Sequence, residues 1–555
     1  MSKLSPITFS KEEFVKELEG LAKAGKAAAT TSREVAEILD QSDALRTLRD
    51  EYNVPTLADV GASVANGSGP DTKALYLCGN SLGLLSKTSR KYVEEEIDAW
   101  SRKAVLGHWD HPYGRPWTRC EERATRLMAD VVGAKPSEVV VMSSLSSNLH
   151  TMLTTFYKPE KGKRHKILYE ARAFPSDQYA LASAVALAGL DPRESLLAIE
   201  PREGETTLRT DDILATLERE KETAHTIMLG GIQYLSGQLF DVPAVTKRTR
   251  ELGVVVGWDF AHAFANVPLA LHDWDVDFAV WCTYKYGCAG PGAIAGAFVH
   301  ERWGSIGMRT SIGRDAKAKP NAKGVDGLVR PAGWWGHVKS TRFTMPDSFE
   351  AITGAGGFQL SNPPLFEMAC LLGSLETLSR APALLAADGK AAAAAAEDVG
   401  SESYGHAVEA SSGPVGFGHI MPALRQKSLR LTAYLEHLLL QPGFLPSSAH
   451  VSIVTPADPL QRGSQLSIRI PDAPKQEQQA PNGGEGQTNK DHVPPPISAT
   501  TLVARVHKRA EKQRGLVADI RNPDMLRLAP LAQFSTFTDV FDAASALKEA
   551  LEQEL

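Results

Sequence analysis

A lysine between an apolar run and a glycine-rich turn is the residue of this chain best suited to covalent chemistry. In VDFAVWCTYKYGCAGPGAIAG, Lys285 follows residues typical of a buried strand, and Gly287, Gly290 and Gly292 come after it. A lysine is seldom buried without a partner or a task. Glycines let the backbone turn tightly beside a bound molecule, although such turns also occur in ordinary connections. The pattern predicts that Lys285 forms a Schiff base.

A carboxylate and a histidine follow the strand-like run just before this one. Asp259 ends GVVVGWD, and His262 comes three residues later. Ligands of open α/β sheets bind at the carboxyl ends of the strands, so we expect both side chains to lie near Lys285. Asp259 is then suited to hold a protonated ring nitrogen, with His262 beside it. The alternative is a buried strand end whose Asp and His are satisfied by the protein.

A possible anion site precedes both segments. The sequence SSLSSNLH leads from the strand-like EVVVM into a helix-like run, with Leu145 and Ser146 at its start. Backbone N–H groups at a helix N-terminus bind phosphate, but a serine that only caps the helix is equally compatible. A lysine, a carboxylate for a pyridine nitrogen and a phosphate cradle together predict a site for pyridoxal 5'-phosphate, bound covalently to Lys285.

Alternating strand-like and helix-like segments must position these residues. Six β-branched runs lie between about 136 and 298: EVVVM, HKILYE, TIMLGG, GVVVGWDF, DFAVWC and AIAGAFV. Such alternation indicates an α/β fold with a mainly parallel sheet covered on both faces. We predict an N-terminal helical segment over 1–90, a large cofactor-binding domain over 91–340 and a smaller α+β domain over 341–555. Two segments of biased composition, near 387–418 and 471–496, are predicted surface insertions.

Composition excludes several classes of protein. The net charge is -6 and the pI is near 6.2, with no extended basic stripe, so we expect no nucleic-acid partner. The five cysteines show neither metal-ligand spacing nor the density of a disulfide-rich secreted protein. We expect no metal. No secretory signal or membrane-spanning stretch is visible, which favours a cytoplasmic protein.

At these residues the sequence resembles the kynureninases, a family of the aspartate aminotransferase (fold type I) superfamily. The resemblance runs from about 75 to 541, interrupted mainly by the two insertions. It rests on LCGNSLGLLS, GHWDHPYGRPW, SSLSSNLHTML, ARAFPSDQYA, YLSGQLFD, the long stretch from VGWDFAHAF to AGAFVHE, GWWGH, STRFTM, GFQLSNPPL, QRGSQLSI and NPDMLRLAPLAQFSTFTDV.

The resemblance implies a cofactor role for each matching residue. Lys285 is the Schiff-base lysine, Asp259 the partner of the pyridine nitrogen with His262 beside it, and Tyr284 a candidate proton relay. The FPSD segment supplies the stacking ring of Phe174, the turn residues Pro175 and Ser176, and a second carboxylate in Asp177. Phosphate contacts are implied for Leu145, Ser146, Tyr284 and Tyr234.

It also implies a substrate site and a homodimer. Ser81, His108 and Asn362 resemble residues that meet the aryl part of the substrate, and Arg527 resembles the arginine that clamps the α-carboxylate. The resemblance also implies that Trp334 and Asn362 line the cofactor site and are supplied across a dimer interface. The loop WDHPYG is longer than in some relatives, which leaves His111 as an alternative to His108.

The activity implied is hydrolytic Cβ–Cγ cleavage of L-kynurenine and 3-hydroxy-L-kynurenine, giving anthranilate or 3-hydroxyanthranilate plus L-alanine. It belongs to tryptophan catabolism and de novo NAD biosynthesis. An aminotransferase, a desulfurase-like lyase and a catalytically silent cofactor-binding protein are the alternatives. A desulfurase needs a mobile nucleophilic cysteine, whereas Cys370 lies in an apolar helix-like run. The aryl-site residues separate the hydrolase from an aminotransferase.

Overall fold

A computed structural model describes residues 7–63, 69, 71–160, 162–305, 311–313, 329–388, 420–472 and 498–555. The predicted insertions near 387–418 and 471–496 fall almost entirely outside these residues. Within the described part, no helix is long and apolar enough to cross a membrane.

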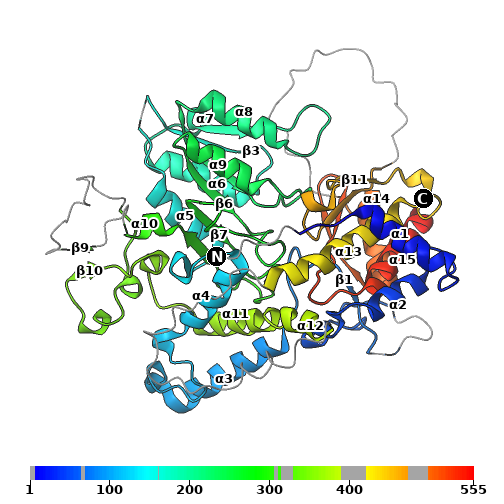
Figure 1. The fold of residues 1–555 in the computed structure, drawn as a ribbon, viewed down its shortest axis with the longest axis horizontal. Coiled ribbons are helices and arrows are strands. Elements are labelled where there is room, and N and C mark those ends of the chain that lie inside the picture. Colours follow the sequence, from blue (N-terminus) through cyan, green and yellow to red (C-terminus); the bar gives the residue numbers. More distant parts are fainter. Residues whose placement is uncertain are drawn as a thin grey trace.

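A seven-stranded sheet forms the centre of the larger half of the molecule (Figure 1). Its order is β2-β8-β7-β6-β5-β3-β4, and β3 to β7 run parallel to one another, while β8 is antiparallel to both β2 and β7. The prediction of an α/β fold with a mainly parallel sheet is confirmed. The strands are β2 (Val139–Val141), β3 (Lys166–Glu170), β4 (Leu196–Ile199), β5 (Ala224–Gly230), β6 (Val255–Asp259), β7 (Phe278–Trp281) and β8 (Gly296–Val299).

Helices cover both faces of this sheet because each face is apolar. On one face, α5 and α6 share a buried cluster with Val140, Met228 and Phe278. On the other, α4, α8 and α9 share a larger cluster with Leu168 and Ile227. These helices are α4 (Glu121–Val132), α5 (Leu145–Phe156), α6 (Pro175–Leu187), α8 (Thr210–Glu220) and α9 (Val242–Glu251), with the short α7 (Pro192–Ser195) and α10 (Glu301–Ser305) beside them.

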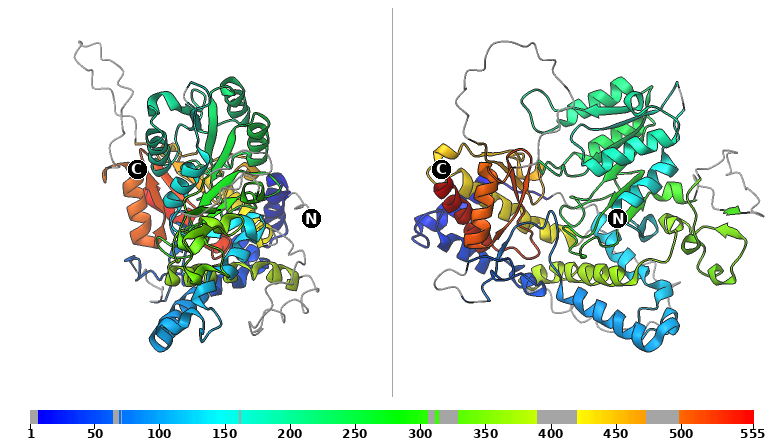
Figure 2. Two further views of the ribbon diagram at one scale, coloured as in Figure 1. Left: turned by 90° about the vertical axis from the view of Figure 1, so that its left-hand side faces the viewer. Right: turned by 180° about the vertical axis from the view of Figure 1, so that it is seen from behind.

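A smaller α+β unit packs beside the large one and has its own core. Its four-stranded antiparallel sheet has the order β11-β12-β15-β14, and β1 pairs with β13 next to it. Figure 2 shows the N-terminal helices, in blue, beside the C-terminal helix, in red, because α1 lies against α13 and α2 against α15. The elements are α1 (Lys11–Lys23), α2 (Arg33–Gln41), β1 (Leu75–Tyr76), β11 (Ser452–Ile453), β12 (Leu466–Arg469), β13 (Leu516–Val517), β14 (Asp519–Arg521), β15 (Met525–Leu528), α13 (Ile420–Leu440), α14 (Leu502–Arg514) and α15 (Phe537–Glu554).

Two long helices run along one side of the molecule. α3 (Lys87–Lys103) and α11 (Leu365–Leu378) pack tightly on each other, with α12 (Ala381–Asp388) after α11. Buried residues of α11 join the core of the large unit, as do Leu45, Leu48, Tyr52, Val54 and Leu84. The domain limits at 90 and 340 stay predictions. Shorter elements are β9 (Ser311–Gly313), β10 (Ser348–Glu350) and the 3-10 turns η1 (Arg46–Glu51), η2 (Ala104–His108), η3 (Trp117–Arg119), η4 (Pro136–Glu138), η5 (Trp334–Gly336), η6 (Arg342–Thr344), η7 (Ala355–Phe358), η8 (Ser447–Ala449) and η9 (Pro459–Gln461).

Candidate active site

A pocket opens at the carboxyl ends of the parallel strands, where the sequence predicts one. Glu170, Gly230 and Asp259 are the last residues of β3, β5 and β6, and Lys285 follows β7. Their strands are neighbours, so their ends meet at one sheet edge. The pocket is lined by Leu145, Ser146, Glu170, Phe174, Ser176, Asp177, Gly230, Ile232, Tyr234, Asp259, Ala261, His262, Tyr284 and Lys285.

The lysine and the histidine are in direct contact. Lys285 Nζ lies 2.9 Å from His262 Nε2. Burial, and then the charge of Lys285, hold the pKa of His262 well below its ordinary value. His262 is therefore neutral, and its Nε2 can accept a hydrogen bond from the lysine. Gly290 and Gly292 of the turn have left-handed backbone angles, and a side chain on Gly287 would strike the carbonyl oxygen of Thr283.

Two buried carboxyl groups, Asp177 and Asp259, lie next to each other in the pocket. Asp259 Oδ1 accepts a hydrogen bond of 2.7 Å from the Ala261 backbone N–H. Burial, and then the Asp259 carboxylate, raise the pKa of Asp177 well above the ordinary carboxyl range. Two neighbouring buried carboxyl groups cannot both ionise at low cost, because their negative charges repel each other. The pair therefore shares one proton, with Asp177 as the donor and Asp259 as the carboxylate.

The opposite end of the pocket is formed by the start of α5. Leu145 and Ser146 are its first residues, so their backbone N–H groups have no partner within the helix. Ser146 Oγ lies 2.8 Å from Ser176 Oγ in the first turn of α6. Pro175 is the first residue of α6 and sets its start, but it does not line the pocket.

Aromatic rings flank the lysine. The rings of Phe174 and Tyr284 each lie 5.9 Å from Lys285 Nζ. Phe174 is about half exposed, and its ring meets that of Tyr234 edge to face, with centroids 5.2 Å apart. A ring left exposed beside a lysine and two acids can cover a flat ligand.

Arg527 lies next to the pocket but is already well paired. It is 2% exposed and donates from Nε to Asp519 Oδ1 at 2.6 Å, while Nη2 bonds the other Asp519 oxygen. Its Nη1 donates to the carbonyl oxygen of Tyr234 at 2.7 Å. Three of the five N–H donors are therefore used, and two are left for a ligand.

The segment that carries Ser81 packs on the lysine turn. The Gly83 N–H donates to the Tyr284 carbonyl at 2.8 Å, and a side chain on Gly83 would strike the Lys285 carbonyl oxygen. Ser81 is half-buried and does not line the pocket of this chain.

The two histidines of the WDHPYG loop have different environments. His111 is buried: its Nε2 lies 3.0 Å from Glu96 Oε2, and its Nδ1 accepts from the Tyr113 N–H. Both of its nitrogens are thus engaged, Nε2 by Glu96 of α3 and Nδ1 by the loop backbone. Among the described residues the His108 ring makes a hydrogen bond only through Nδ1, to the Val105 carbonyl at 2.9 Å; His108 is half-buried and does not line the pocket. This contrast favours His108 as the ligand-binding histidine.

Trp334 and Asn362 lie away from the pocket of their own chain. Trp334, in η5, is 43% exposed and donates from Nε1 to the Arg342 carbonyl at 3.0 Å. Asn362 is exposed. Its segment lies beside η5, because Gly333 packs on the backbone of Leu360. Neither residue lines the pocket.

Four pocket residues were not predicted: Glu170, Gly230, Ile232 and Ala261. Gly230 could have been found, because TIMLGG ends at the same sheet edge as Asp259. Glu170 ends the run KILYE and carried the same positional signal. Ile232 and Ala261 follow strand ends but have no reactive group.

These residues fit pyridoxal 5'-phosphate. Asp177 Oδ1 is buried and has no hydrogen-bond partner among the described residues, so it has capacity for a polar ligand. The helix start at Leu145 suits a phosphate, the Asp259 carboxylate suits a protonated ring nitrogen, and Lys285 suits an aldehyde.

Comparison with solved structures shows the fold. The chain is similar to a cysteine desulfurase from Escherichia coli, with 13% identity and a TM-score of 0.58, covering 92% of this chain and 98% of that one. It is also similar to the cystine C-S lyase in complex with cysteine persulfide, with 13% identity and a TM-score of 0.55, covering 87% and 97%. At this identity the likeness concerns the fold alone.

Sequence relatives give the family. The aminotransferase class-V model matches residues 93–303, and the kynureninase C-terminal domain model matches 424–480 and 500–547. The chain is 42% identical to the kynureninase of Myxococcus xanthus, covering 93% of this chain and 97% of that protein. It is 39% identical to the kynureninase of Coccidioides immitis (93% and 93%) and 39% identical to kynureninase 2 of Aspergillus niger (95% and 97%). The chain belongs to the kynureninase family.

Proposed function

We propose that this chain is a pyridoxal phosphate-dependent hydrolase that cleaves the Cβ–Cγ bond of L-kynurenine or its 3-hydroxy form. The products are anthranilate or 3-hydroxyanthranilate and L-alanine, and one water is consumed. The observation that carries this proposal is the pocket itself, in which Lys285, the Asp177 and Asp259 pair and the α5 start converge in a kynureninase-family chain. We assign it to tryptophan catabolism and NAD biosynthesis in the cytoplasm.

The residues of the chain divide the work. Lys285 would hold the cofactor covalently until substrate arrives and would then act as the base, because neutral His262 accepts a hydrogen bond from its Nζ. The cofactor supplies an electron sink for a carbanion. Asp259 would keep the ring nitrogen protonated, and Asp177 would stay protonated and donate a hydrogen bond to Asp259 rather than compete for the ring. Tyr284, with a pKa raised by burial, would stay protonated and can donate to a phosphate or relay a proton.

Residues outside the pocket lining would orient the substrate. The two free donors of Arg527 would bind the α-carboxylate, and its bonds to Asp519 and Tyr234 would fix the plane of the guanidinium. Orientation of this kind aligns the bond to be broken and so lowers the barrier. Ser81, His108 and Asn362 would meet the aryl group.

A homodimer would complete the site. Trp109, Trp334 and Phe343 stack in one aromatic group and are 59%, 43% and 41% exposed. Exposed apolar groups of this size mark association surfaces. The same face carries Trp334 and Asn362, which do not reach the pocket of their own chain. We propose that each protomer supplies both residues to the site of its partner.

The alternative activities are less well supported. Cys370 lies within α11, and burial raises the pKa of its thiol, so it is a poor nucleophile for a desulfurase. An aminotransferase would share Lys285, Asp259 and Arg527. It would not need His108, whose free Nε2 is one observation that favours the hydrolase.

Product analysis tests this proposal. Purified protein is supplied with cofactor and either kynurenine, and anthranilates, alanine and keto acids are quantified against Lys285→Ala. We expect one alanine per anthranilate, and no product together with loss of the cofactor's visible absorbance band in the variant. A keto acid product, or an intact band without turnover, would show that the substrate site is assigned wrongly.

A further inference from the structure

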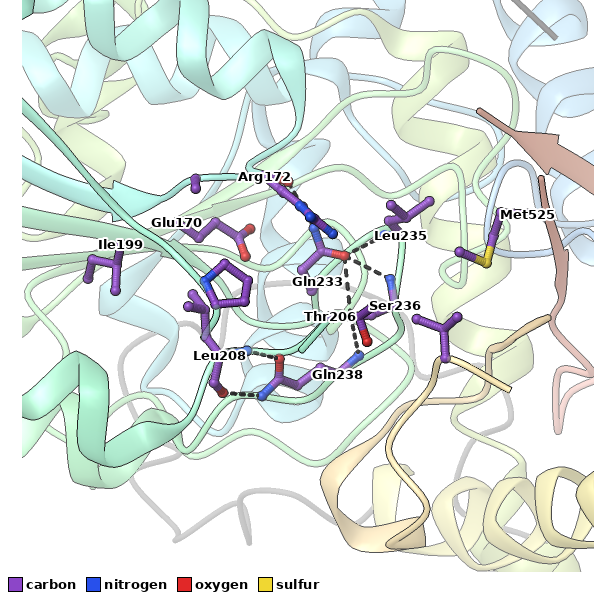
Figure 3. Close-up of a pocket in the computed structure, with 13 residues that line it drawn as sticks. Glu170, Arg172, Ile199, Thr206, Leu208, Gln233, Leu235, Ser236, Gln238 and Met525 are labelled. Carbon is purple, nitrogen blue, oxygen red and sulfur yellow. Dashed lines mark hydrogen bonds between the residues drawn. The ribbon is translucent and has the colours of Figure 1, made fainter. Parts of the chain in front are cut away.

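A second cavity lies directly beside the cofactor pocket. Residues of the large unit line most of it, and Val454 and Met525 of the smaller unit close one side (Figure 3). Its volume is about 40 Å³, enough for a few water molecules. Two of its lining residues, Arg172 and Thr206, are exposed, so the cavity reaches the surface. It is therefore a second route from solvent toward the site.

Glu170 is the one residue that lines both cavities. It is 4% exposed, and within the described part of the chain its carboxyl makes no hydrogen bond or ion pair. In Figure 3 this carboxyl points into the second cavity. Water no longer solvates the charge of a carboxyl that ionises in a buried place without a partner, so Glu170 is held for the most part in its neutral form.

Gly230 lies between Glu170 and Asp259 along the sheet edge, because β5 stands between β3 and β6. A Cβ atom added to Gly230 would lie 3.4 Å from Glu170 Oε1, so the carboxyl rests against this residue. Gly230 pairs in register with Asp259 on the neighbouring strand. Because glycine has no side chain, no side chain of Gly230 blocks the space between Glu170 and Asp259.

Charges on the surrounding elements also bear on Glu170. Burial, and then the Asp259 carboxylate, raise the pKa of Glu170 to about 8. Glu170 therefore gains and loses its proton near neutral pH, where an acid can both donate and accept a proton. The other groups that face this region are Asp177 on α6, Lys285 after β7, Tyr234 after β5 and Arg172 after β3.

We propose that Glu170 is a proton-relay residue, which connects the Asp177 and Asp259 pair to the solvent-accessible second cavity. Glu170 releases one proton to water in that cavity. The Asp177 and Asp259 pair then gives one proton to Glu170, which restores its neutral form. The same steps in reverse return a proton, so no other reactant is needed. The pair can thus change its protonation state while substrate closes the main mouth. The inference rests on the proposed function only in taking the pocket to hold pyridoxal phosphate.

The test uses the holoenzyme and reads the cofactor's absorbance rather than turnover. Glu170→Gln keeps the shape of the side chain but cannot release a proton. Glu200→Gln is the matched control, because Glu200 is an exposed carboxyl that follows the neighbouring strand β4. After a pH jump, we expect the absorbance of Glu170→Gln to relax at least about 10-fold more slowly than wild type, the scale of one lost acid-base group. Glu200→Gln should relax like wild type.

A second variant guards against a folding defect. Thr206→Trp places a bulky ring at the cavity mouth and leaves Glu170 in place. It should slow the relaxation without shifting the equilibrium titration of the band. Wild-type rates in both variants would overturn the relay. Turnover of kynurenine by the wild-type preparation is measured in parallel, so that failure of the hydrolase assignment is seen separately from failure of the relay.

Discussion

The shared proton of Asp177 and Asp259 predicts that two adjacent acids respond very differently to the same substitution. Asp259 is the carboxylate of the pair and Asp177 the donor, because burial and the Asp259 charge raise the pKa of Asp177 well above its ordinary range. Changing aspartate to asparagine removes a negative charge at Asp259. At Asp177 it replaces one neutral hydrogen-bond donor by another of nearly the same size.

The expected magnitudes follow from the bonds lost. In Asp259→Asn, the bond to a charged ring nitrogen is lost, and bonds to charged groups contribute about 1.5–3 kcal/mol. At 1.36 kcal/mol per factor of ten, cofactor affinity should fall about 10- to 150-fold. In Asp177→Asn, only a neutral hydrogen bond is altered, about 0.5–1.5 kcal/mol, so the loss should stay below roughly 12-fold.

Equilibrium titration of each variant with pyridoxal phosphate, followed by the absorbance band, measures both affinities. Circular dichroism and the unfolding midpoint of the cofactor-free proteins serve as controls for folding. A larger loss in Asp177→Asn would mean that the proton resides on Asp259, and equal losses would mean that the two acids do not differ in charge. Either result would refute the assignment of the pair.

Further predictions concern Arg527, Trp334, Glu138 and the pH dependence of stability. Arg527→Lys keeps the charge but loses the planar fork held by Asp519; steady-state kinetics should show KM rising about 10- to 100-fold, more than kcat falls. Trp334→Ala should weaken self-association in sedimentation equilibrium and lower activity, which an inactive Lys285→Ala protomer with an intact Trp334 should partly restore in mixed dimers. Glu138→Ala removes a fully buried carboxylate that accepts from the backbone of Lys135 and Glu301, so urea unfolding should show a loss of roughly 1–3 kcal/mol for each donor left unpaired. Glu170 binds its proton more tightly in the folded than in the unfolded chain, so its contribution to stability is complete at low pH and is lost as pH rises toward about 8. In cofactor-free protein, Glu170→Gln should therefore lose less stability than wild type between pH 5 and 8, as measured by urea unfolding.

Much of the fold was accessible from periodicity. The six predicted runs all became strands of the central sheet, because each combines β-branched residues with a length that one strand can bury. β4 was missed: LLAI is only partly buried at the sheet edge, and its residues carry no alternation that separates them from a loop. The antiparallel direction of β8 was also not predictable, because chain direction depends on the connection through the lysine turn.

The site was predictable where chemistry and strand ends coincide, and less so elsewhere. Lys285, His262 and Asp259 were expected together because adjacent parallel strands end at one edge, and the 2.9 Å contact between Lys285 and His262 agrees with that expectation. The choice between His108 and His111 could not be made from the loop. It depends on Glu96, which is far enough away in the sequence that only the packing of α3 brings it to His111.

The proposed division of the site between one pocket and one exposed face has a physical reason. Lys285, Asp259 and the other pocket groups proposed to hold the cofactor lie at the large unit's sheet edge, where packing on both faces fixes each strand end. Of the residues expected to meet the aryl group, His108 ends η2 and Asn362 follows η7, and neither lies in or directly after a strand of that sheet. The segments around η2, η5 and η6 instead contact one another through the rings of Trp109, Trp334 and Phe343. An exposed aromatic group gains rigidity when a second surface covers it. A substrate site completed by a partner would therefore be ordered by the same contact that buries this face, and selectivity for the aryl ring would depend on assembly in a way that cofactor binding does not.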